Sequence, residues 1–171
     1  RVILLGRNKQ NLENTLQSME GSDHEIISFD LTEFSYFNKL LKDIIGYTKG
    51  LDGVVHCAGI QAYESLFMIE EDSIEKILRL NVSTPALLTK GIRQERLLNK
   101  NSSIVFLSSI VGMVGGAGAS VYAASKSALI ALAKSLAVEL ASDGIRVNCI
   151  APAIVETPMS DALMYACEQQ M

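Results

Sequence analysis

The chain has 171 residues, of which 49% are hydrophobic and 20% are charged, which is enough apolar material for one core and predicts a single domain over residues 1–171. Fifteen basic and nineteen acidic residues give a net charge of −4, and the absence of a basic run excludes a nucleic-acid-binding surface. No charge-free apolar stretch reaches the roughly 18 residues of a membrane span, and three scattered cysteines favour a reducing cytoplasm over a disulfide or zinc scaffold.

Five apolar runs of strand length alternate with helical segments along the chain. The runs comprise residues 2–5, 25–29, 53–57, 103–107 and 145–150. Helical patterns occupy residues 9–19, 33–46, 70–99 (as two helices) and 120–142. This alternation predicts parallel strands joined by helical crossovers, and runs that are apolar on both faces predict a sheet covered on both sides. The expected fold class is therefore α/β with a doubly wound parallel sheet.

Two features surround the last predicted helix. Residues 112–118 contain four glycines in the position of a phosphate-binding loop, but Val121 stands where the third glycine of that motif belongs, so a flexible loop is predicted instead. The helix at 120–142 has almost no polar face and is expected to be buried nearly all round. We interpret it as a subunit interface, and the alternative is a central helix within a larger monomer.

Hydrolase and metal chemistry are not indicated by the two histidines. His24 and His56 both precede the candidate serines, and no G-x-S-x-G elbow occurs, so the chain order of an α/β-hydrolase triad is absent. Neither histidine has a second ligand three or four residues away, and no metal site is predicted. His56, at the end of an apolar strand, is predicted to be a core or pocket-wall residue.

Three residues form a candidate proton-transfer site. Tyr122 and Lys126 lie four residues apart at the start of a predicted helix, so their side chains share a face. A nearby ammonium stabilises a phenolate and is expected to lower the pKa of Tyr122. Ser109 follows the preceding strand, at the edge where open parallel sheets bind ligands, and its hydroxyl can hold the oxygen of a carbonyl or alcohol. Such a site needs a hydride donor, which implies a nicotinamide cofactor.

These residues resemble the short-chain dehydrogenase/reductase family over essentially the whole chain. Ser109 matches the family's catalytic serine, and Tyr122-Ala-Ala-Ser-Lys126 matches its Tyr-x-x-x-Lys pair. Asn81, in Leu-Asn-Val, matches the asparagine that holds a proton-relay water. The resemblance therefore implies a complete catalytic tetrad of Asn81, Ser109, Tyr122 and Lys126.

The same resemblance implies a set of cofactor-binding residues. Asp30, followed by Leu31, is similar to the adenine-side aspartate, and Tyr122 and Lys126 would also contact the cofactor. Segments similar to the family's Asn-Ala-Gly and Pro-Gly-x-x-x-Thr motifs contribute Cys57, Ala58, Gly59, Pro152, Ala153, Ile154 and Thr157. Cys57 replaces the asparagine and Ala153 replaces the glycine of those motifs, without loss of a catalytic group.

The resemblance also carries an expectation about length. The family begins with a strand and a glycine-rich loop that cradles pyrophosphate, whereas this chain starts at what resembles the second strand. The missing strand would lie between the second and fourth, which predicts two unpaired ladder edges. A final helix and strand also have no counterpart. The chain is thus expected to be a fragment of a Rossmann-like domain of about 250 residues, with weak cofactor binding of its own.

Cofactor, substrate and partners follow from the same pattern. Arg7, at the end of the first predicted strand, favours NADP over NAD because an arginine pairs with a 2′-phosphate. Residues 109–157 are similar to those of carrier-protein ketoacyl reductases, but Val138 stands where their helix often has an arginine, and other carbonyls or secondary alcohols stay open. A homodimer or homotetramer through residues 120–142 is expected. The alternative function is a catalytically silent oligomerisation or binding module.

Overall fold

A computed structural model describes residues 1–157 of the chain, and Cys167 lies outside the described residues. The five predicted strands are present as β1 (Ile3–Gly6), β2 (Glu25–Ser28), β3 (Leu51–His56), β4 (Leu98–Leu107) and β5 (Arg146–Ile150). The largest difference is at β4, which begins five residues earlier than predicted. Its first residues are polar and carry no apolar pattern, but Leu98 lies opposite Leu51 in the ladder.

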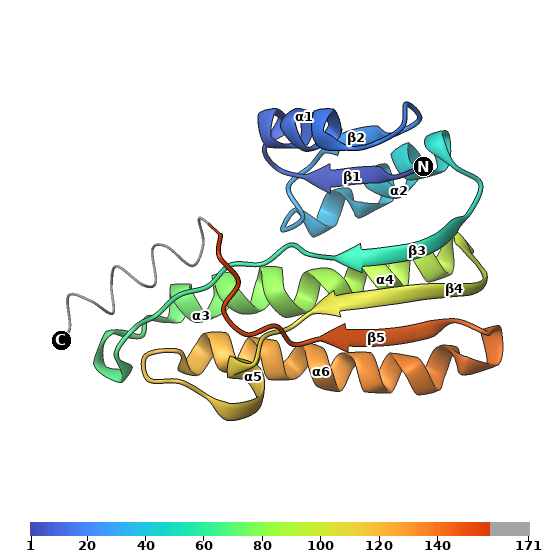
Figure 1. The fold of residues 1–171 in the computed structure, drawn as a ribbon. Helices are drawn as coiled ribbons and strands as arrows, with labels where there is room; N and C mark the ends of the chain where they lie inside the picture. Colours follow the sequence, from blue (N-terminus) through green and yellow to red (C-terminus); the bar gives the residue numbers. More distant parts are fainter. Residues whose placement is uncertain (158–171) are drawn as a thin grey trace.

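The strands form two parallel sheets rather than one continuous sheet. β1 pairs with β2, whereas β3, β4 and β5 form a separate sheet in that order. Figure 1 shows the β1–β2 pair beyond the free edge of β3. No ladder joins β1 to β3 within residues 1–157, so two strands keep unpaired edges, as the sequence predicted. Val55 of β3 is accordingly 62% exposed.

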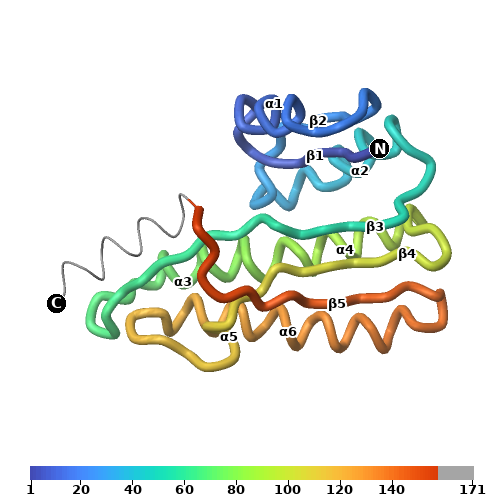
Figure 2. Tube along the Cα trace, in the orientation of Figure 1, coloured from blue at the N-terminus to red at the C-terminus, as the bar shows by residue number. Residues whose placement is uncertain are grey.

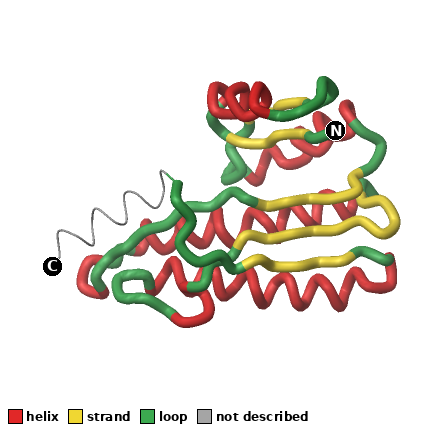
Figure 3. The backbone as a smooth tube through the Cα atoms, in the orientation of Figure 1, coloured by secondary structure: helices red, strands yellow, loops and turns green. Residues whose placement is uncertain are grey.

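The helices connect the strands in the alternating order that the sequence predicts, as the colouring of Figure 3 shows. α1 packs against β1 and β2, whereas α6 packs against β4 and β5, and Figure 2 traces the path of the chain through these layers. The α-helices are α1 (Lys9–Ser18), α2 (Phe37–Tyr47), α3 (Glu71–Leu78), α4 (Thr84–Gln94), α5 (Val111–Val114) and α6 (Ser120–Leu140). Shorter turns are η1 (Phe34–Tyr36), η2 (Leu66–Met68), the π-helical η3 (Arg79–Ser83) and η4 (Ala141–Asp143).

Two apolar clusters hold the layers together. The first lies between the β1–β2 pair, α2 and α4, and includes Ile27, Leu40 and Ile92. The second lies between the three-stranded sheet and α6, and includes Phe106 and Leu129. Each fully buried side chain of this size stabilises the fold by roughly 1.5–3 kcal/mol relative to an exposed one. The clusters fix the carboxyl ends of the strands, where the candidate site lies.

Two expectations about the region of α6 need correction. Residues 111–114, part of which was predicted as a flexible loop, form the short helix α5. α6 is not buried nearly all round, because its contacts with the sheet cover one side and leave Val138 81% exposed. By length and composition alone, the segment Ser120–Asp143 could cross a membrane. Its packing against β4 and β5 and its buried Lys126 fit a helix of the α/β layers instead.

Candidate active site

Tyr122 and Ser109 are brought together at the carboxyl end of β4. Ser109 follows the strand by two residues, and its Oγ accepts a hydrogen bond of 3.4 Å from the Val111 backbone. Tyr122 lies in the first turn of α6 and is buried. The Ser109 and Tyr122 side chains line the same cavity, and the Ser109 hydroxyl lies close enough to act on the pKa of the phenol. The structure therefore joins the two hydroxyl groups that the sequence placed in one site.

Lys126 lies one turn further along α6 and is also buried. Its Nζ donates a hydrogen bond of 2.8 Å to the Leu107 carbonyl and lies 5.6 Å from the centre of the Tyr122 ring. Gly112 fits against the backbone at this point, since a Cβ there would come within 2.8 Å of the Lys126 carbonyl carbon. The Ser108 hydroxyl donates to the same carbonyl group at 2.7 Å. These contacts fix the position of the Lys126 ammonium relative to the Tyr122 ring.

The electrostatics of the pair differ from the expectation. Burial raises the pKa of Tyr122, the hydrogen bond with Ser109 opposes this rise, and Tyr63 adds to it. Burial also lowers the pKa of Lys126, and Cys149 opposes that change. The prediction that Lys126 lowers the pKa of Tyr122 is therefore wrong for this arrangement, because removal from water dominates at both groups. Tyr122 is a protonated donor at neutral pH.

Asn81 is fully buried in the π-helical turn η3. Its Oδ1 accepts from the Ile60 backbone amide at 2.9 Å, and its Nδ2 donates to the Ile60 carbonyl at 2.8 Å and to the Ser125 hydroxyl at 3.0 Å. A Cβ at Gly59 would lie 3.2 Å from Asn81 Oδ1 and 3.4 Å from Lys126 Nζ. Asn81 thus ties the segment after β3 to α6, and glycine permits the close approach.

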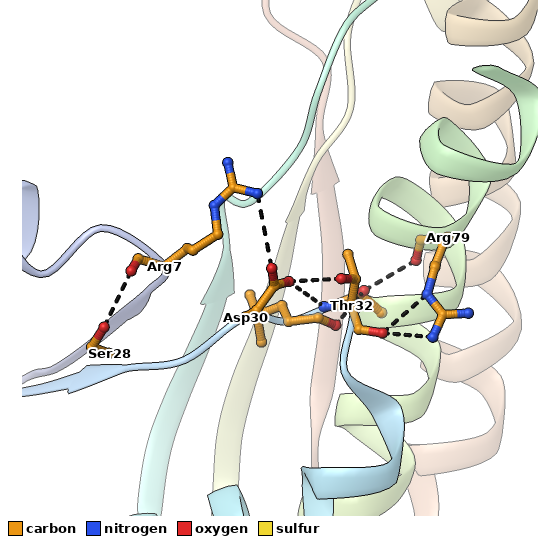
Figure 4. A network of polar contacts seen from close by, with 7 residues as sticks. Arg7, Ser28, Asp30, Thr32 and Arg79 are labelled. Atoms are coloured by element: carbon orange, nitrogen blue, oxygen red, sulfur yellow. Dashed lines mark hydrogen bonds and ion pairs between the residues drawn. The ribbon is translucent and has the colours of Figure 1, made fainter. Parts of the chain in front are cut away.

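A second polar cluster surrounds Asp30, beyond the carboxyl end of β2. The Asp30 carboxylate accepts hydrogen bonds from the amide and hydroxyl of Thr32 at 2.9 and 2.7 Å, which lower its pKa. Arg7 Nη1 lies 3.8 Å from the same carboxylate, and Ser28 donates to the Arg7 carbonyl at 3.1 Å. Arg79 donates to the Thr32 carbonyl at 3.0 and 2.7 Å. Figure 4 shows these contacts around Asp30.

The remaining predicted cofactor residues have different surroundings. The Leu31 side chain is buried in the first apolar cluster, and its carbonyl accepts from Thr84 at 2.9 Å, so its side chain faces the core and not a ligand. Cys57 is exposed after β3, directly before Ala58 and Gly59. The segment after β5 returns to the candidate site, because the Pro152 carbonyl accepts from the Ile110 amide at 2.8 Å.

A cavity of about 180 Å³ lies in front of Ser109 and Tyr122. It includes four residues of the predicted Pro-Gly-like motif, namely Pro152, Ala153, Ile154 and Thr157. Sequence reasoning missed the other lining residues, which are Gln61, Tyr63, Ser108, Ile110, Val111 and Val155. No spacing pattern marks these residues, although their positions next to the three motifs were a usable signal.

His56 lies beneath this site and is buried, as predicted, with 5% of its surface exposed. Its ring meets Phe106 edge to face at 6.4 Å, and its Nε2 has no hydrogen-bond partner within residues 1–157. Burial lowers the pKa of His56 to about 4, the Lys126 charge acts in the same direction, and a hydrogen bond with the Ala58 backbone opposes the shift. The imidazole is therefore neutral in the folded protein at neutral pH.

We expect the free energy of unfolding to fall as the pH drops from 6.5 towards 4. The unfolded chain binds a proton at His56 in this window and the folded chain does not, so the loss reaches about 2 kcal/mol at pH 5. Urea unfolding at pH 7.5 and pH 5 measures this loss. The variant His56→Leu should lack the part of the pH dependence that comes from His56. If the free energy of unfolding of His56→Leu depended on pH as in the wild type, the low pKa of His56 would not be its cause.

Comparison with known proteins identifies the family. A model of short chain dehydrogenases matches residues 1–167. Carbonyl reductase family member 4 of Danio rerio is 35% identical over 164 residues, with 95% of this chain and 68% of that protein covered. The 3-oxoacyl-acyl-carrier-protein reductase of Thermotoga maritima is 30% identical over 164 residues, with 95% of this chain and 67% of that protein covered.

A solved structure shows the same likeness. An actinorhodin polyketide ketoreductase with NADPH superposes with a TM-score of 0.88 and 25% identity, over 97% of this chain and 65% of that chain. The chain thus spans about two thirds of the length of the relatives it matches. The matched family model, the parallel α/β fold and these relatives lead to one conclusion. The chain belongs to the short chain dehydrogenase family, whose members are NAD(P)-dependent oxidoreductases.

Proposed function

We propose that this chain is an oxidoreductase that transfers hydride between NADPH and a carbonyl compound or secondary alcohol. The observation that carries the proposal is that Ser109 and Tyr122 line one cavity, with Lys126 buried one helical turn further along α6. A phenol, a hydroxyl and an ammonium in this order can hold a carbonyl oxygen and protonate it. Asn81 positions the segment after β3 beside them.

Each residue has a definite part in the proton step. The nicotinamide, when bound, supplies the hydride that no side chain can provide. Ser109 donates a hydrogen bond to the substrate oxygen, and Tyr122 transfers its proton to that oxygen. The Lys126 ammonium then lies beside the phenolate that remains, 5.6 Å from the ring centre. Because burial raises the pKa of Tyr122, the phenol carries at neutral pH the proton that this step needs.

The residues present fit the two ends of a dinucleotide. Lys126 takes part in none of the ion pairs within residues 1–157, so its ammonium can donate to ribose hydroxyl groups at the nicotinamide end. Gly59 leaves the approach to Lys126 and Asn81 open. Arg7 and Asp30 form a charged pair where the adenosine end would lie. The proposal assigns no residue to the pyrophosphate.

Oxidation of NADPH and NADH in the presence of a panel of ketones and aldehydes tests this function. We expect carbonyl-dependent turnover with at least one compound and a lower KM for NADPH. No turnover with any carbonyl would contradict the proposal and would favour the alternative, an oligomerisation or binding module. Val138, a large apolar side chain of α6 that is 81% exposed, supports a homodimer or homotetramer through residues 120–142 in either case.

The cofactor preference is expected to depend on Arg7. Its side chain is 83% exposed and forms only a long ion pair with Asp30, so a 2′-phosphate can reach its guanidinium. Arg7→Gln should raise the KM for NADPH about tenfold, the loss of roughly one charge-assisted hydrogen bond, and should leave the KM for NADH unchanged.

The matched control for this variant is Arg1→Gln. Arg1 pairs with Glu25 at the opposite end of β1, so its loss should change neither KM. Steady-state kinetics and titration of NADPH binding by fluorescence measure both variants. A wild-type chain that prefers NADH, with Arg7→Gln unchanged, would contradict the preference for NADPH. In that case Asp30 would be the residue that selects the ribose hydroxyl groups.

On location, we propose a reducing compartment such as the cytoplasm. Cys57 and Cys149 are both free thiols, and Cys57 is exposed. Exposed free cysteines are uncommon in oxidising compartments, where they form disulfides. This supports the cytoplasmic interpretation of the sequence.

A further inference from the structure

The cavity in front of Tyr122 has walls from three separate segments and α6. The segment after β3 contributes Tyr63, the end of β4 contributes Ile110, and the segment after β5 contributes Ile154. At about 180 Å³ the cavity is slightly larger than the space of about 150 Å³ that holds one benzene molecule, and it shares Pro152, Ala153, Ile154 and Thr157 with the predicted cofactor site. Its size therefore suits a small substrate with no more than one ring.

The wall of this cavity is mixed. Polar groups come from Gln61, Ser108, Ser109, Tyr122 and Thr157, and apolar or aromatic surface comes from Tyr63, Ile110, Val111, Pro152, Ile154 and Val155. None of the residues that line it within the described chain carries a charge. A charged substrate would lose its hydration there without gaining a counter-ion, which is costly. The cavity thus favours uncharged substrates.

Tyr63 is the aromatic side chain closest to the reacting group. Its ring centre lies 6.2 Å from that of Tyr122, with 44° between the ring planes. The chain is anchored on both sides of Tyr63. Asn81 holds the Ile60 backbone, the Glu64 amide donates to the Gly118 carbonyl at 2.7 Å, and the Glu64 carboxylate accepts from Ser73 at 2.9 Å. These contacts hold the backbone that presents the Tyr63 ring, which is 39% exposed, to the cavity.

We propose that Tyr63 determines substrate specificity, and that the non-reacting group of the substrate packs on its ring while the carbonyl oxygen meets Ser109 and Tyr122. The substrates are then uncharged ketones or aldehydes that carry a single six-membered ring. This inference rests on the proposed function, because it assumes that the carbonyl is reduced at Tyr122. It adds the class of substrate and the residue that selects it.

Kinetics with two matched ketones tests the specificity. Acetophenone carries the ring and 2-butanone lacks it. Tyr63→Ala should raise the KM for acetophenone about tenfold, as expected for loss of an aromatic contact. It should change the KM for 2-butanone less than twofold. Tyr63→Phe keeps the ring and should restore the KM for acetophenone. Tyr47→Ala, at the end of α2 and away from the cavity, is the control.

Binding measured without turnover separates this inference from the proposed function. Saturation-transfer NMR of acetophenone should show a signal with the wild-type chain, a weaker one with Tyr63→Ala, and little with 4-acetylbenzoate, which adds a charge. If this pattern is found without reduction of any carbonyl, the binding inference stands and the proposed function fails. If carbonyls are reduced while Tyr63→Ala leaves the KM for acetophenone unchanged, the inference is overturned and the function stands.

Discussion

Replacing Tyr122 with phenylalanine is expected to reduce kcat for carbonyl reduction by about 10³-fold, within the range for loss of a positioned acid. The Tyr122 phenol is the acidic hydroxyl that lines the cavity beside Ser109, where the substrate oxygen is proposed to lie. Phenylalanine keeps the ring and its contact with Tyr63, so only the proton is lost. Initial rates with NADPH and the best ketone of the panel measure the effect.

Two checks make this result specific. Thermal unfolding should show that Tyr122→Phe lowers the stability little, because the ring stays in place. The KM for the ketone should change much less than kcat, since the proton is transferred in the transition state and the wall of the cavity is unchanged. Equal kcat values for the variant and the wild type would contradict the assignment of Tyr122 as the proton donor. The substrate oxygen at Ser109 would then receive its proton from another group.

The second large effect concerns stability and centres on Asn81. Asn81→Leu should lower the free energy of unfolding by roughly 2 kcal/mol, because the partly buried amide and carbonyl of Ile60 lose their partner. The hydroxyl of Ser125 loses an interaction as well. Carbonyl reduction should also fall sharply, since the segment that carries Tyr63 is no longer tied to η3. Urea unfolding and initial rates measure the two effects.

Asn14→Leu is the matched control for this substitution. Asn14 is exposed on α1, and its side chain accepts only from Gln10. Its replacement should change the free energy of unfolding by less than about 0.5 kcal/mol. An Asn81→Leu variant as stable as the control would show that the Ile60 backbone finds other partners, and it would contradict the anchoring role of Asn81.

Much of the fold was predictable because the relevant signals are local. The five apolar runs became strands, and the alternation of strands and helices gave their parallel arrangement. Two features escaped prediction. Residues 99–102 near the start of β4 are polar, and the ladder shifts register across them, from Leu51 opposite Leu98 to Gly53 opposite Ser103. The exposure of Val138 depends on which side of α6 meets the sheet, and composition alone does not specify this.

The candidate site also has features that the sequence predicts and features that it does not. Tyr122 and Lys126 are one helical turn apart, so their spacing alone predicted that they share a face. Tyr63 has no such spacing, because its place beside Tyr122 depends on how the segment after β3 folds back onto η3 and the loop before α6. The direction of the Tyr122 pKa shift could not be predicted from the sequence either, because its largest cause is the burial of the side chain in the folded protein.

The division into two sheets has a consequence for how ligands and stability are connected. Asp30 and Arg7 belong to the β1–β2 pair, whereas Tyr122 and Lys126 belong to the layer of β3–β5. Side-chain contacts, such as that of Arg79 with the Thr32 carbonyl, join the two layers without a shared backbone ladder. A ligand that contacts both layers therefore links them. Part of its binding free energy offsets the conformational entropy that is lost when the relative position of the two layers becomes fixed.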